Sequence, residues 1–257
     1  MTWSPDAQRG DSPEVPAPAT GRVPDRPRPG VAGRVAAVRA RIAAAAAAAG
    51  RDPAEVTLVA VAKYQPVAAI RAALAAGVAD IGENYAQDLK AKAAEVDPEY
   101  PGARWHMVGR VQRNKAAVLV ATGALVHSLD SLELARVLGR RASAEGTVLE
   151  ALVQVEVDQR EAAHGVRPEA LEGFVDACRQ IDGLRLRGLM VLPAPDADPR
   201  VAFERVAELG LLVGPEMPHL SMGMSADLEQ AVEAGATMVR IGTAIFGPRP
   251  GRADEKR

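Results

Sequence analysis

The feature that most constrains the fold is a repeated alternation of short apolar runs with segments of helical period. Eight apolar runs are candidate strands, and they occupy residues 56–63, 79–84, 104–109, 124–130, 149–158, 184–192, 219–223 and 237–242. Segments with apolar residues at helical spacing, such as "PVAAIRAALAAG", lie between them. Strands that alternate with helices form parallel βαβ units. Eight units in a chain of 257 residues predict an α/β fold, a single (β/α)8 barrel of the TIM type.

A doubly wound open sheet is the alternative architecture. It requires a reversal of strand order, which no sequence pattern displays, and its dinucleotide-binding members carry a GxGxxG turn after the first strand. The segment that follows the first apolar run here, "KYQP", has no such turn. We therefore prefer the barrel and predict that it spans residues 30–250.

The two ends of the chain differ in composition from the predicted barrel. Residues 1–29 contain seven prolines and few large apolar side chains. Such a segment buries too little apolar surface to offset the entropy lost on ordering, so we predict a disordered tail. Residues 251–257, "GRADEKR", are predicted to form a short charged tail.

Composition and charge narrow the classes of partner. The net charge of −2 gives no reason to expect nucleic acid or an anionic membrane as partner. The single cysteine, Cys178, excludes an internal disulfide, and four scattered histidines show no metal-ligand spacing. No segment has the length and apolarity of a membrane span, and the N-terminus lacks the apolar core of a secretory signal. The expected compartment is the cytoplasm.

One lysine lies at the end of the first predicted strand. The stretch "LVAVAKYQP" stops being apolar at Lys63, and only five of the 31 basic residues in the chain are lysines. A lysine can lose its proton when it is desolvated, whereas an arginine cannot. The active site of a barrel lies at the C-terminal ends of its strands. Lys63 is therefore a candidate nucleophilic amine, although a lysine that reaches from a strand end to water is the common alternative.

The turns after the last two predicted strands are rich in small residues. "LSMGMSADLEQA" contains Ser221 and Ser225, and "VRIGTAIFG" contains Gly242 and Thr243. In barrels of this type these two turns are a recurrent phosphate site, because backbone N–H groups at helix N-termini bind anions. Small residues are also common in ordinary turns. We expect Ser225 to begin a helix in "SADLEQA" and Asp130 or Ser131 to begin one in "DSLELA".

Barrel closure makes the first strand and the last strand neighbours. A reactive lysine next to a phosphate site indicates a phosphorylated aldehyde, which points to pyridoxal 5′-phosphate held as a Schiff base. Arg240 lies two residues before Gly242, and side chains two apart on a strand share a face. Arg240 is therefore placed to reach the ring nitrogen.

These stretches resemble the pyridoxal-phosphate homeostasis protein family. The resemblance is carried by "AVAKYQP", "IGENYAQDLKAK", "WHMVGRVQRNK", "HSLDS", "GLM" and "LSMGMSADLEQAVEAGATMVRIGTAIFG". It implies a single barrel like the N-terminal domain of alanine racemase, with the cofactor bound to Lys63. It also implies a role in keeping this reactive aldehyde available yet contained and in amino- and keto-acid balance, without an established catalytic turnover.

The resemblance assigns roles to individual positions. It implies that Asn84 lies near the cofactor, that Ser221, Gly242 and Thr243 are phosphate ligands, that Met222 flanks the phosphate and that Arg240 contacts the ring nitrogen. It further implies a monomer and suggests apoenzymes that depend on the cofactor as partners. Arg110 departs from the family pattern, in which histidine or proline is common, so its role stays undefined.

An amino-acid racemase is the alternative function. Racemisation needs an acid or base on each face of the cofactor adduct. Lys63 could supply one, but "PRPGRADEKR" after residue 247 contains no second domain, and neither Tyr64 nor Tyr85 has an evident place opposite Lys63. An arginine at the ring nitrogen leaves that nitrogen unprotonated, which weakens the ring as an electron sink. We therefore expect a carrier without catalytic turnover.

Several other polar residues lie near the predicted strand ends. His106 is equally expected to line the pocket or to pack inside the strand layer, because histidine is a residue of intermediate burial. His164 is expected in a loop, and Lys115 is expected at the surface near a helix start, with a secondary role in aldehyde binding as the alternative. The carboxylates of Glu156 and Asp158 have no evident task.

Overall fold

The computed structural model describes Met1, residues 30–158 and residues 164–248. The predicted tails at residues 2–29 and 251–257 lie outside the described residues. The description therefore covers nearly all of the predicted barrel.

Eight parallel strands close into one barrel, with each strand hydrogen-bonded to its neighbours in chain order and β1 paired with β8. Their bounds are β1 Thr57–Val61, β2 Asp80–Glu83, β3 Arg104–Met107, β4 Leu125–Leu129, β5 Leu149–Gln154, β6 Leu184–Met190, β7 His219–Ser221 and β8 Met238–Ile241. Every one of them falls within a run predicted from the sequence. The prediction of a (β/α)8 barrel is confirmed, and the open sheet is excluded because β1 and β8 pair in register.

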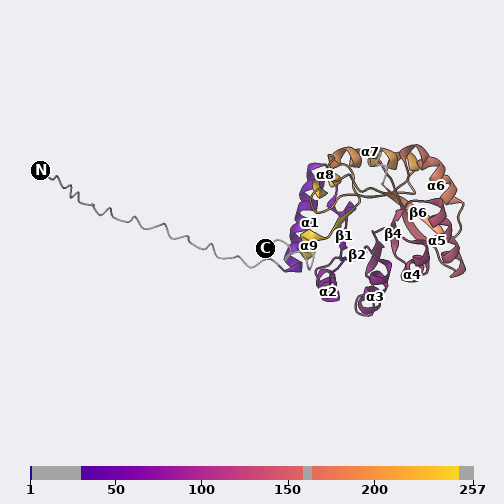
Figure 1. The fold of residues 1–257 in the computed structure, drawn as a ribbon, viewed down its shortest axis with the longest axis horizontal. Coiled ribbons are helices and arrows are strands. Elements are labelled where there is room, and N and C mark those ends of the chain that lie inside the picture. The colour runs from indigo at the N-terminus through magenta and orange to yellow at the C-terminus, as the bar shows by residue number, and fades with distance from the viewer. Residues whose placement is uncertain (2–29, 159–163, 249–257) are drawn as a thin grey trace.

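Helices follow the strands and cover the outside of the barrel (Figure 1). Their bounds are α1 Val31–Ala48, α2 Val67–Ala75, α3 Ala86–Val96, α4 Ala116–Thr122, α5 Leu132–Ala144, α6 Leu171–Arg179, α7 Pro199–Val213, α8 Leu228–Glu233 and α9 Thr243–Phe246. Three short 3₁₀ helices complete the described elements at Pro53–Glu55, Arg113–Lys115 and Pro168–Ala170. Because parallel strands point the same way, all the loops after the strands meet at one rim of the barrel.

The apolar core has two parts. The larger part joins buried residues of the strands to those of the surrounding helices. A smaller cluster consists only of strand residues, namely Val59, Leu152, Met190 and Met238, and therefore fills the inside of the barrel. Such filling is expected, because the interior of an eight-stranded barrel is packed with side chains and is not a pore.

The first helix, α1, lies beside α8 and α9, so the start of the barrel packs on its end (Figure 1). Three arginines of this region donate to backbone carbonyl groups there. Nε of Arg34 donates to the carbonyl oxygen of Ile245, Nη2 of Arg41 donates to that of Ser225 at 3.1 Å, and Nη1 of Arg51 donates to that of Val232 at 2.7 Å. These bonds tie α1 and the residues just after it to α9, to the turn after β7 and to α8.

The two predicted helix starts have different outcomes. Ser131 is the N-cap of α5, and its hydroxyl accepts a hydrogen bond from the N–H group of Leu134 at 3.4 Å. Ser225 does not begin α8, whose N-cap is Asp227. The Ser225 hydroxyl instead accepts a hydrogen bond from the N–H group of Ala244 at 3.2 Å. The expectation for Ser225 was wrong because a contact with the start of α9, distant in the sequence, replaces the local cap.

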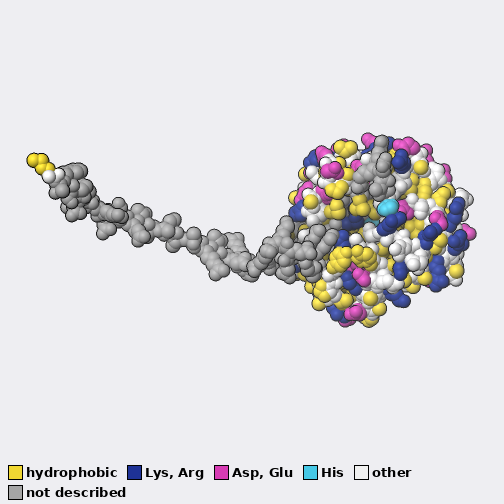
Figure 2. All heavy atoms as spheres, in the orientation of Figure 1, with side chains coloured by type: hydrophobic (Ala, Val, Ile, Leu, Met, Phe, Trp, Pro, Cys, Tyr) yellow, Lys and Arg dark blue, Asp and Glu magenta, His cyan; other side chains and the backbone are white. Residues whose placement is uncertain are grey.

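No helix among the described residues is long and apolar enough to cross a membrane. Acidic and basic side chains are interspersed over the face of the barrel shown in Figure 2. This distribution agrees with the nearly neutral net charge of −2.

Candidate functional site

A cavity of about 530 Å³ opens at the C-terminal ends of the strands. Five of the residues predicted from the sequence line it, namely Lys63, Asn84, Arg240, Gly242 and Thr243. Lys63 follows β1, Asn84 follows β2 directly, Arg240 lies in β8, and Gly242 and Thr243 form the start of α9. The barrel thus brings residues from both ends of the chain to one cavity.

Two predicted residues do not line this cavity. The side chains of Ser221 and Met222 are fully buried beneath the turn that follows β7. Met224 and Ser225, farther along the same turn, line the cavity in their place. Gly223, which lies between Met222 and Met224, has a φ of 89°, and a Cβ at this position would lie 2.5 Å from Cβ of Ala231. The turn therefore requires glycine at this position.

Lys63 lies in a tight turn between β1 and α2. The carbonyl oxygen of Ala62 accepts hydrogen bonds from the N–H group of Gln65 at 3.0 Å and from Nζ of Lys92 at 3.0 Å. Tyr64, the next residue, has φ of 63° and is the only non-glycine residue of the described chain with positive φ. Such a conformation persists only where neighbouring contacts enforce it. The backbone on both sides of Lys63 is therefore held in place.

A buried ion pair supports this turn from below. Nζ of Lys92 donates to Oε1 of Glu83 at 2.5 Å, and the Glu83 side chain is fully buried. Burial raises the pKa of Glu83, and the bond with Lys92 offsets only part of that effect. Oε2 of Glu83 also accepts from the N–H group of Asn84 at 3.3 Å. One ion pair thus connects the backbone next to Lys63 with that of Asn84.

Two tyrosines meet beside the cavity. The hydroxyl groups of Tyr64 and Tyr85 lie 2.8 Å apart, and their rings are tilted with centroids 5.9 Å apart. Both side chains are about half exposed, and neither lines the cavity. The pair links the turn that contains Lys63 to the start of α3.

Arg240 is the buried cation of the cavity wall. Nη1 donates to the hydroxyl of Ser221 at 2.7 Å, and Nη2 donates to the carbonyl oxygen of Val191 at 2.9 Å. Only 5% of the residue is exposed, and burial lowers its pKa to about 10. Arg240 therefore stays protonated at neutral pH. A guanidinium has five N–H donors, so three remain beyond these two bonds.

A line of buried polar side chains continues from Ser221 across the barrel. The Ser221 hydroxyl lies 2.8 Å from Nδ1 of His127, and Nε2 of His127 lies 2.9 Å from Nδ1 of His106. Nε2 of His106 lies 2.9 Å from Oδ1 of Asp80, which also forms an ion pair with Arg104. These side chains come from β2, β3, β4, β7 and β8 and connect the cavity wall to the opposite rim.

The electrostatics of this line follow from burial and hydrogen bonding. Burial lowers the pKa of His127 well below 6.5, and the nearby His106 and Arg240 lower it further. Burial alone would raise the pKa of Asp80, but hydrogen bonds from His106 and Arg104 outweigh it and the pKa is lowered. At neutral pH the Asp80 side chain is therefore a carboxylate and the His127 side chain is a neutral imidazole.

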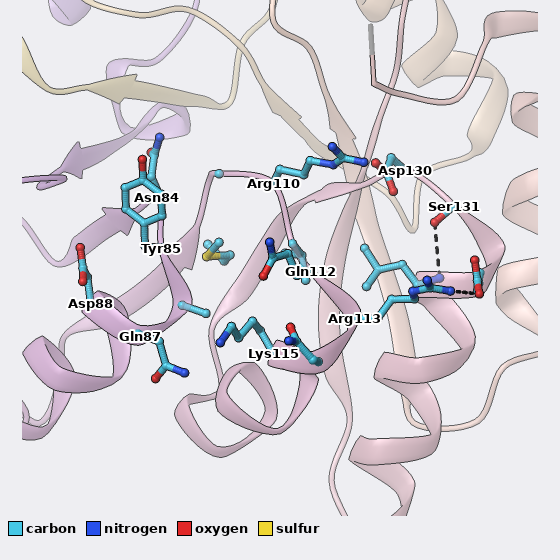
Figure 3. A pocket seen from close by; sticks show the side chains of 17 residues that line it. Asn84, Tyr85, Gln87, Asp88, Arg110, Gln112, Arg113, Lys115, Asp130 and Ser131 are labelled. Atoms are coloured by element: carbon cyan, nitrogen blue, oxygen red, sulfur yellow. Dashed lines mark hydrogen bonds and ion pairs between the residues drawn. The ribbon is translucent and has the colours of Figure 1, made fainter. Parts of the chain in front are cut away.

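A second, wider cavity of about 1330 Å³ adjoins the first (Figure 3). Asn84, Gly109 and Arg110 line both cavities. In Figure 3 the residues that begin α3 form one wall, and Lys115 and Gln112 extend toward the space between that wall and Ser131. A Cβ on Gly109 would lie 2.3 Å from the carbonyl oxygen of Asn84, so glycine permits the close approach of these two loops.

The other polar residues considered from the sequence have mainly structural roles. His106 is a packed strand histidine and does not line the cavity, and Lys115 lies at the start of α4 in the wider cavity. His164 is in a loop, as predicted, and also lines the first cavity. Glu156 and Asp158 accept hydrogen bonds from the N–H groups of Asp158 and Ala194, respectively, and so order a turn.

Two residues were missed by the sequence reasoning. His127 and Asp80 carry the buried line, whereas the residues singled out from the sequence lie just past the ends of their strands, Asn84 after β2 and Asp130 after β4. The available signal was that polar side chains interrupt apolar strands inside the barrel and not at its rim.

No group of three or more histidine, cysteine, aspartate or glutamate residues in the described part of the chain could hold a metal ion.

Comparison with known proteins defines the class. Residues 34–250 match the family model of the alanine racemase N-terminal domain. Alanine racemase from E. faecalis superposes with a TM-score of 0.64 at 18% identity, over 86% of this chain and 59% of the racemase, which shows a shared fold.

Closer relatives specify the family. The pyridoxal phosphate homeostasis protein of Pseudomonas aeruginosa is 45% identical over 222 residues, which cover 85% of this chain and 96% of the relative. That of Escherichia coli K12 is 37% identical over 226 residues, with 85% and 97% coverage. PipY from Synechococcus elongatus, solved with pyridoxal phosphate bound, superposes with a TM-score of 0.74 at 34% identity, over 84% of this chain and all of PipY. The chain belongs to the pyridoxal phosphate homeostasis protein family.

Proposed function

We propose that this protein binds pyridoxal 5′-phosphate and holds it in the cytoplasm as a Schiff base on Lys63, so that the reactive aldehyde is contained yet available. The observation that carries this proposal is that Lys63 and Arg240 line one cavity together with the turn at Gly242 and Thr243. The cofactor-bound structure of PipY supports it.

The residues present fit this group. The cavity volume of about 530 Å³ lies within the usual range for small-molecule sites, about 300–1,000 Å³. Its wall offers an amine at Lys63, guanidinium donors at Arg240, and a turn of small residues at Gly242 and Thr243 for the phosphate. When bound, the cofactor would supply an aldehyde that forms a reversible covalent bond with an amine.

Each residue has a distinct task in this proposal. Lys63 holds the aldehyde carbon, and Arg240 donates a hydrogen bond to the ring nitrogen. Thr243 and the backbone of Gly242 bind the phosphate, while Asn84 contacts the ring from the β2 side. Ser221 and Met222 were predicted beside the phosphate, but their burial supports a role from beneath the cavity wall.

Racemisation of amino acids is not the proposed function. Among the described residues that line the cavity there is no tyrosine to act as acid or base opposite Lys63. Arg240 only donates hydrogen bonds, so a ring nitrogen that faces it must accept and is unprotonated. We propose a monomeric carrier that supplies cofactor-dependent apoenzymes and thereby affects amino- and keto-acid balance.

The test is an absorbance spectrum of the protein with pyridoxal 5′-phosphate, before and after borohydride, followed by mass mapping. The expected result is a yellow species that borohydride fixes as an adduct on Lys63 and that Lys63→Ala abolishes. Lys90→Ala, an exposed lysine on α3, is the matched control and should retain the adduct. An adduct mainly on Lys115 or Lys92 would show that the assignment is wrong.

A further inference from the structure

The buried line from Asp80 to Arg240 has two possible directions of hydrogen bonding. Each imidazole can donate from one nitrogen and accept at the other, so the four contacts must be assigned together. The two ends restrict the choice, because Arg240 can only donate to Ser221 and the ionised Asp80 can only accept.

In the first direction every contact is satisfied with neutral rings. Nε2–H of His106 donates to Asp80, which leaves Nδ1 of His106 as the acceptor for Nε2–H of His127. Nδ1 of His127 then accepts from the Ser221 hydroxyl, whose oxygen accepts from Nη1 of Arg240. His106, His127 and Ser221 each donate once and accept once in the line, while Arg240 only donates and Asp80 only accepts.

The reverse direction adds a proton to the same space. If Nδ1–H of His127 donates to Ser221, its Nε2 must accept from His106, and His106 must then carry a second proton or face a protonated Asp80. The Ser221 oxygen would accept from both Arg240 and His127, and the structure provides no acceptor for its own proton among the described residues. A buried unpaired donor and an extra buried charge both carry a large free-energy cost. The first direction is therefore favoured.

We propose that Asp80, His106, His127 and Ser221 are positioning residues for Arg240, forming one hydrogen-bonded chain of fixed direction that holds its guanidinium against the cavity wall. Ser221 in β7 and the carbonyl group of Val191 after β6 hold the guanidinium at two points, while Arg240 itself belongs to β8. These two contacts, one from β7 and one from the residue that follows β6, fix both the position and the plane of the group. The remaining N–H donors of Arg240 are then available to a ligand in the cavity.

The direction of the chain depends on the protein alone, whereas its role toward a ligand rests on the proposed function. Nitrogen-15 NMR of histidine-labelled protein without cofactor tests the direction. Both His106 and His127 should be neutral with the proton on Nε2, with assignments from His106→Gln and His127→Gln variants. A proton on Nδ1 of His127 would overturn the assigned direction and with it the proposal.

The role is tested with two ligands that lack the aldehyde and so cannot bond to Lys63. They are pyridoxine 5′-phosphate and its analogue with C–H in place of the ring nitrogen, and the measurement is calorimetric affinity. The unmodified protein should prefer the nitrogen-containing ligand about tenfold, as expected for one hydrogen bond to a charged group. Ser221→Ala should reduce that preference to about twofold or less.

Ser128→Ala is the matched control, because Ser128 is equally buried on β4 but donates to the carbonyl oxygen of Gly109. It should keep the tenfold preference. A full preference in Ser221→Ala would show that the chain does not position Arg240. If neither ligand binds the unmodified protein, the contacts proposed for Arg240 and the phosphate turn are wrong; the borohydride test decides the bond to Lys63, and the NMR result decides the direction of the chain.

Discussion

Arg41 in α1 donates a hydrogen bond to the carbonyl oxygen of Ser225, a residue of the cavity wall, at 3.1 Å. The same side chain forms two bonds with Glu229 of α8, at 2.6 and 2.8 Å. A helix outside the repeating barrel units thus supports the turn after β7, whose Ser225 hydroxyl accepts from Ala244 next to the proposed phosphate site.

This support predicts a phosphate-specific defect. Arg41→Ala should weaken binding of pyridoxal 5′-phosphate about three- to tenfold, the range for loss of one hydrogen bond, and barely change binding of unphosphorylated pyridoxal. Arg39→Ala is the control, since Arg39 lies on the same helix but donates to the carbonyl groups of Ala76 and Gly77. Equal weakening of both ligands in equilibrium dialysis would place the effect away from the phosphate.

Thr243 and Ser221 should differ in the part of the cofactor they affect. Thr243→Ala should cost about 1.5–3 kcal/mol of affinity for the phosphorylated ligand, because it removes a hydrogen bond to a charged oxygen. Ser221→Ala should weaken phosphorylated and unphosphorylated ligands alike, because its hydroxyl contacts Arg240. A phosphate-selective loss in Ser221→Ala would restore the role predicted from the sequence.

The stability of the protein should fall on mild acidification because of His127. Its pKa is lowered well below 6.5 in the folded state, so between pH 6.5 and that lowered pKa only the unfolded chain takes up the proton. This group alone should reduce the free energy of unfolding by up to about 1.4 kcal/mol for each pH unit below 6.5. The burial-lowered pKa of His219 adds a change of the same sign.

Urea denaturation between pH 7 and pH 5 measures this dependence. His127→Gln should flatten the slope, and a smaller slope from His219 should remain. His164→Gln, at an exposed loop position, is the control and should keep the original slope. An unchanged slope in His127→Gln would contradict the assignment of a neutral buried ring.

Removal of Lys92 should destabilise the fold strongly. Lys92→Met leaves Glu83 fully buried without its cation, and breaking a buried pair on one side costs about 3–5 kcal/mol. The burial that raises the pKa of Glu83 predicts that part of the loss is recovered at low pH, where the carboxyl group is protonated. Denaturant midpoints measure both effects, with Lys90→Met as an exposed control on the same helix. A loss of less than 1 kcal/mol, the range of exposed pairs, would show that the pair is not buried in solution.

The protein should not racemise alanine at an enzymatic rate. A positioned acid or base contributes about 10²–10⁴ in rate, and no tyrosine occupies that place among the described residues of the cavity. Chiral analysis of L-alanine incubated with cofactor-loaded protein, with Lys63→Ala as the blank, measures this. Turnover of about 1 s⁻¹ or faster would favour the racemase.

The barrel could be predicted from sequence because its signal is local. Each strand is a short apolar run that is followed by its own helix. Each of the eight strand-helix units can therefore be predicted from its own sequence, and together they predict one fold. Lys63 was expected from the rule that function lies at strand ends, Arg240 from the period of side chains along a strand and Asn84 from the family resemblance, and all three line the cavity.

The interior chain could not be predicted in the same way. His106 and His127 meet only because β3 and β4 pair with a specific register, in which His106 lies opposite Leu125. Ser225 shows the same limit on a smaller scale. Its neighbours in sequence suggest a helix cap, but its hydroxyl bonds to Ala244, which lies at the start of α9.

The binding site can form only after β8 has paired with β1 and closed the barrel, which limits when binding can begin during protein synthesis. Val59 of β1 pairs with Arg240 of β8, so the turn with Lys63 and the turn with Thr243 meet only when the last strand joins the first. A ribosome releases the N-terminal part of a chain first, and a partly synthesised barrel lacks β8 and everything that β8 holds. A nascent chain without β8 therefore has the amine but not Arg240, Gly242 or Thr243, and cofactor capture must follow translation of the last strand.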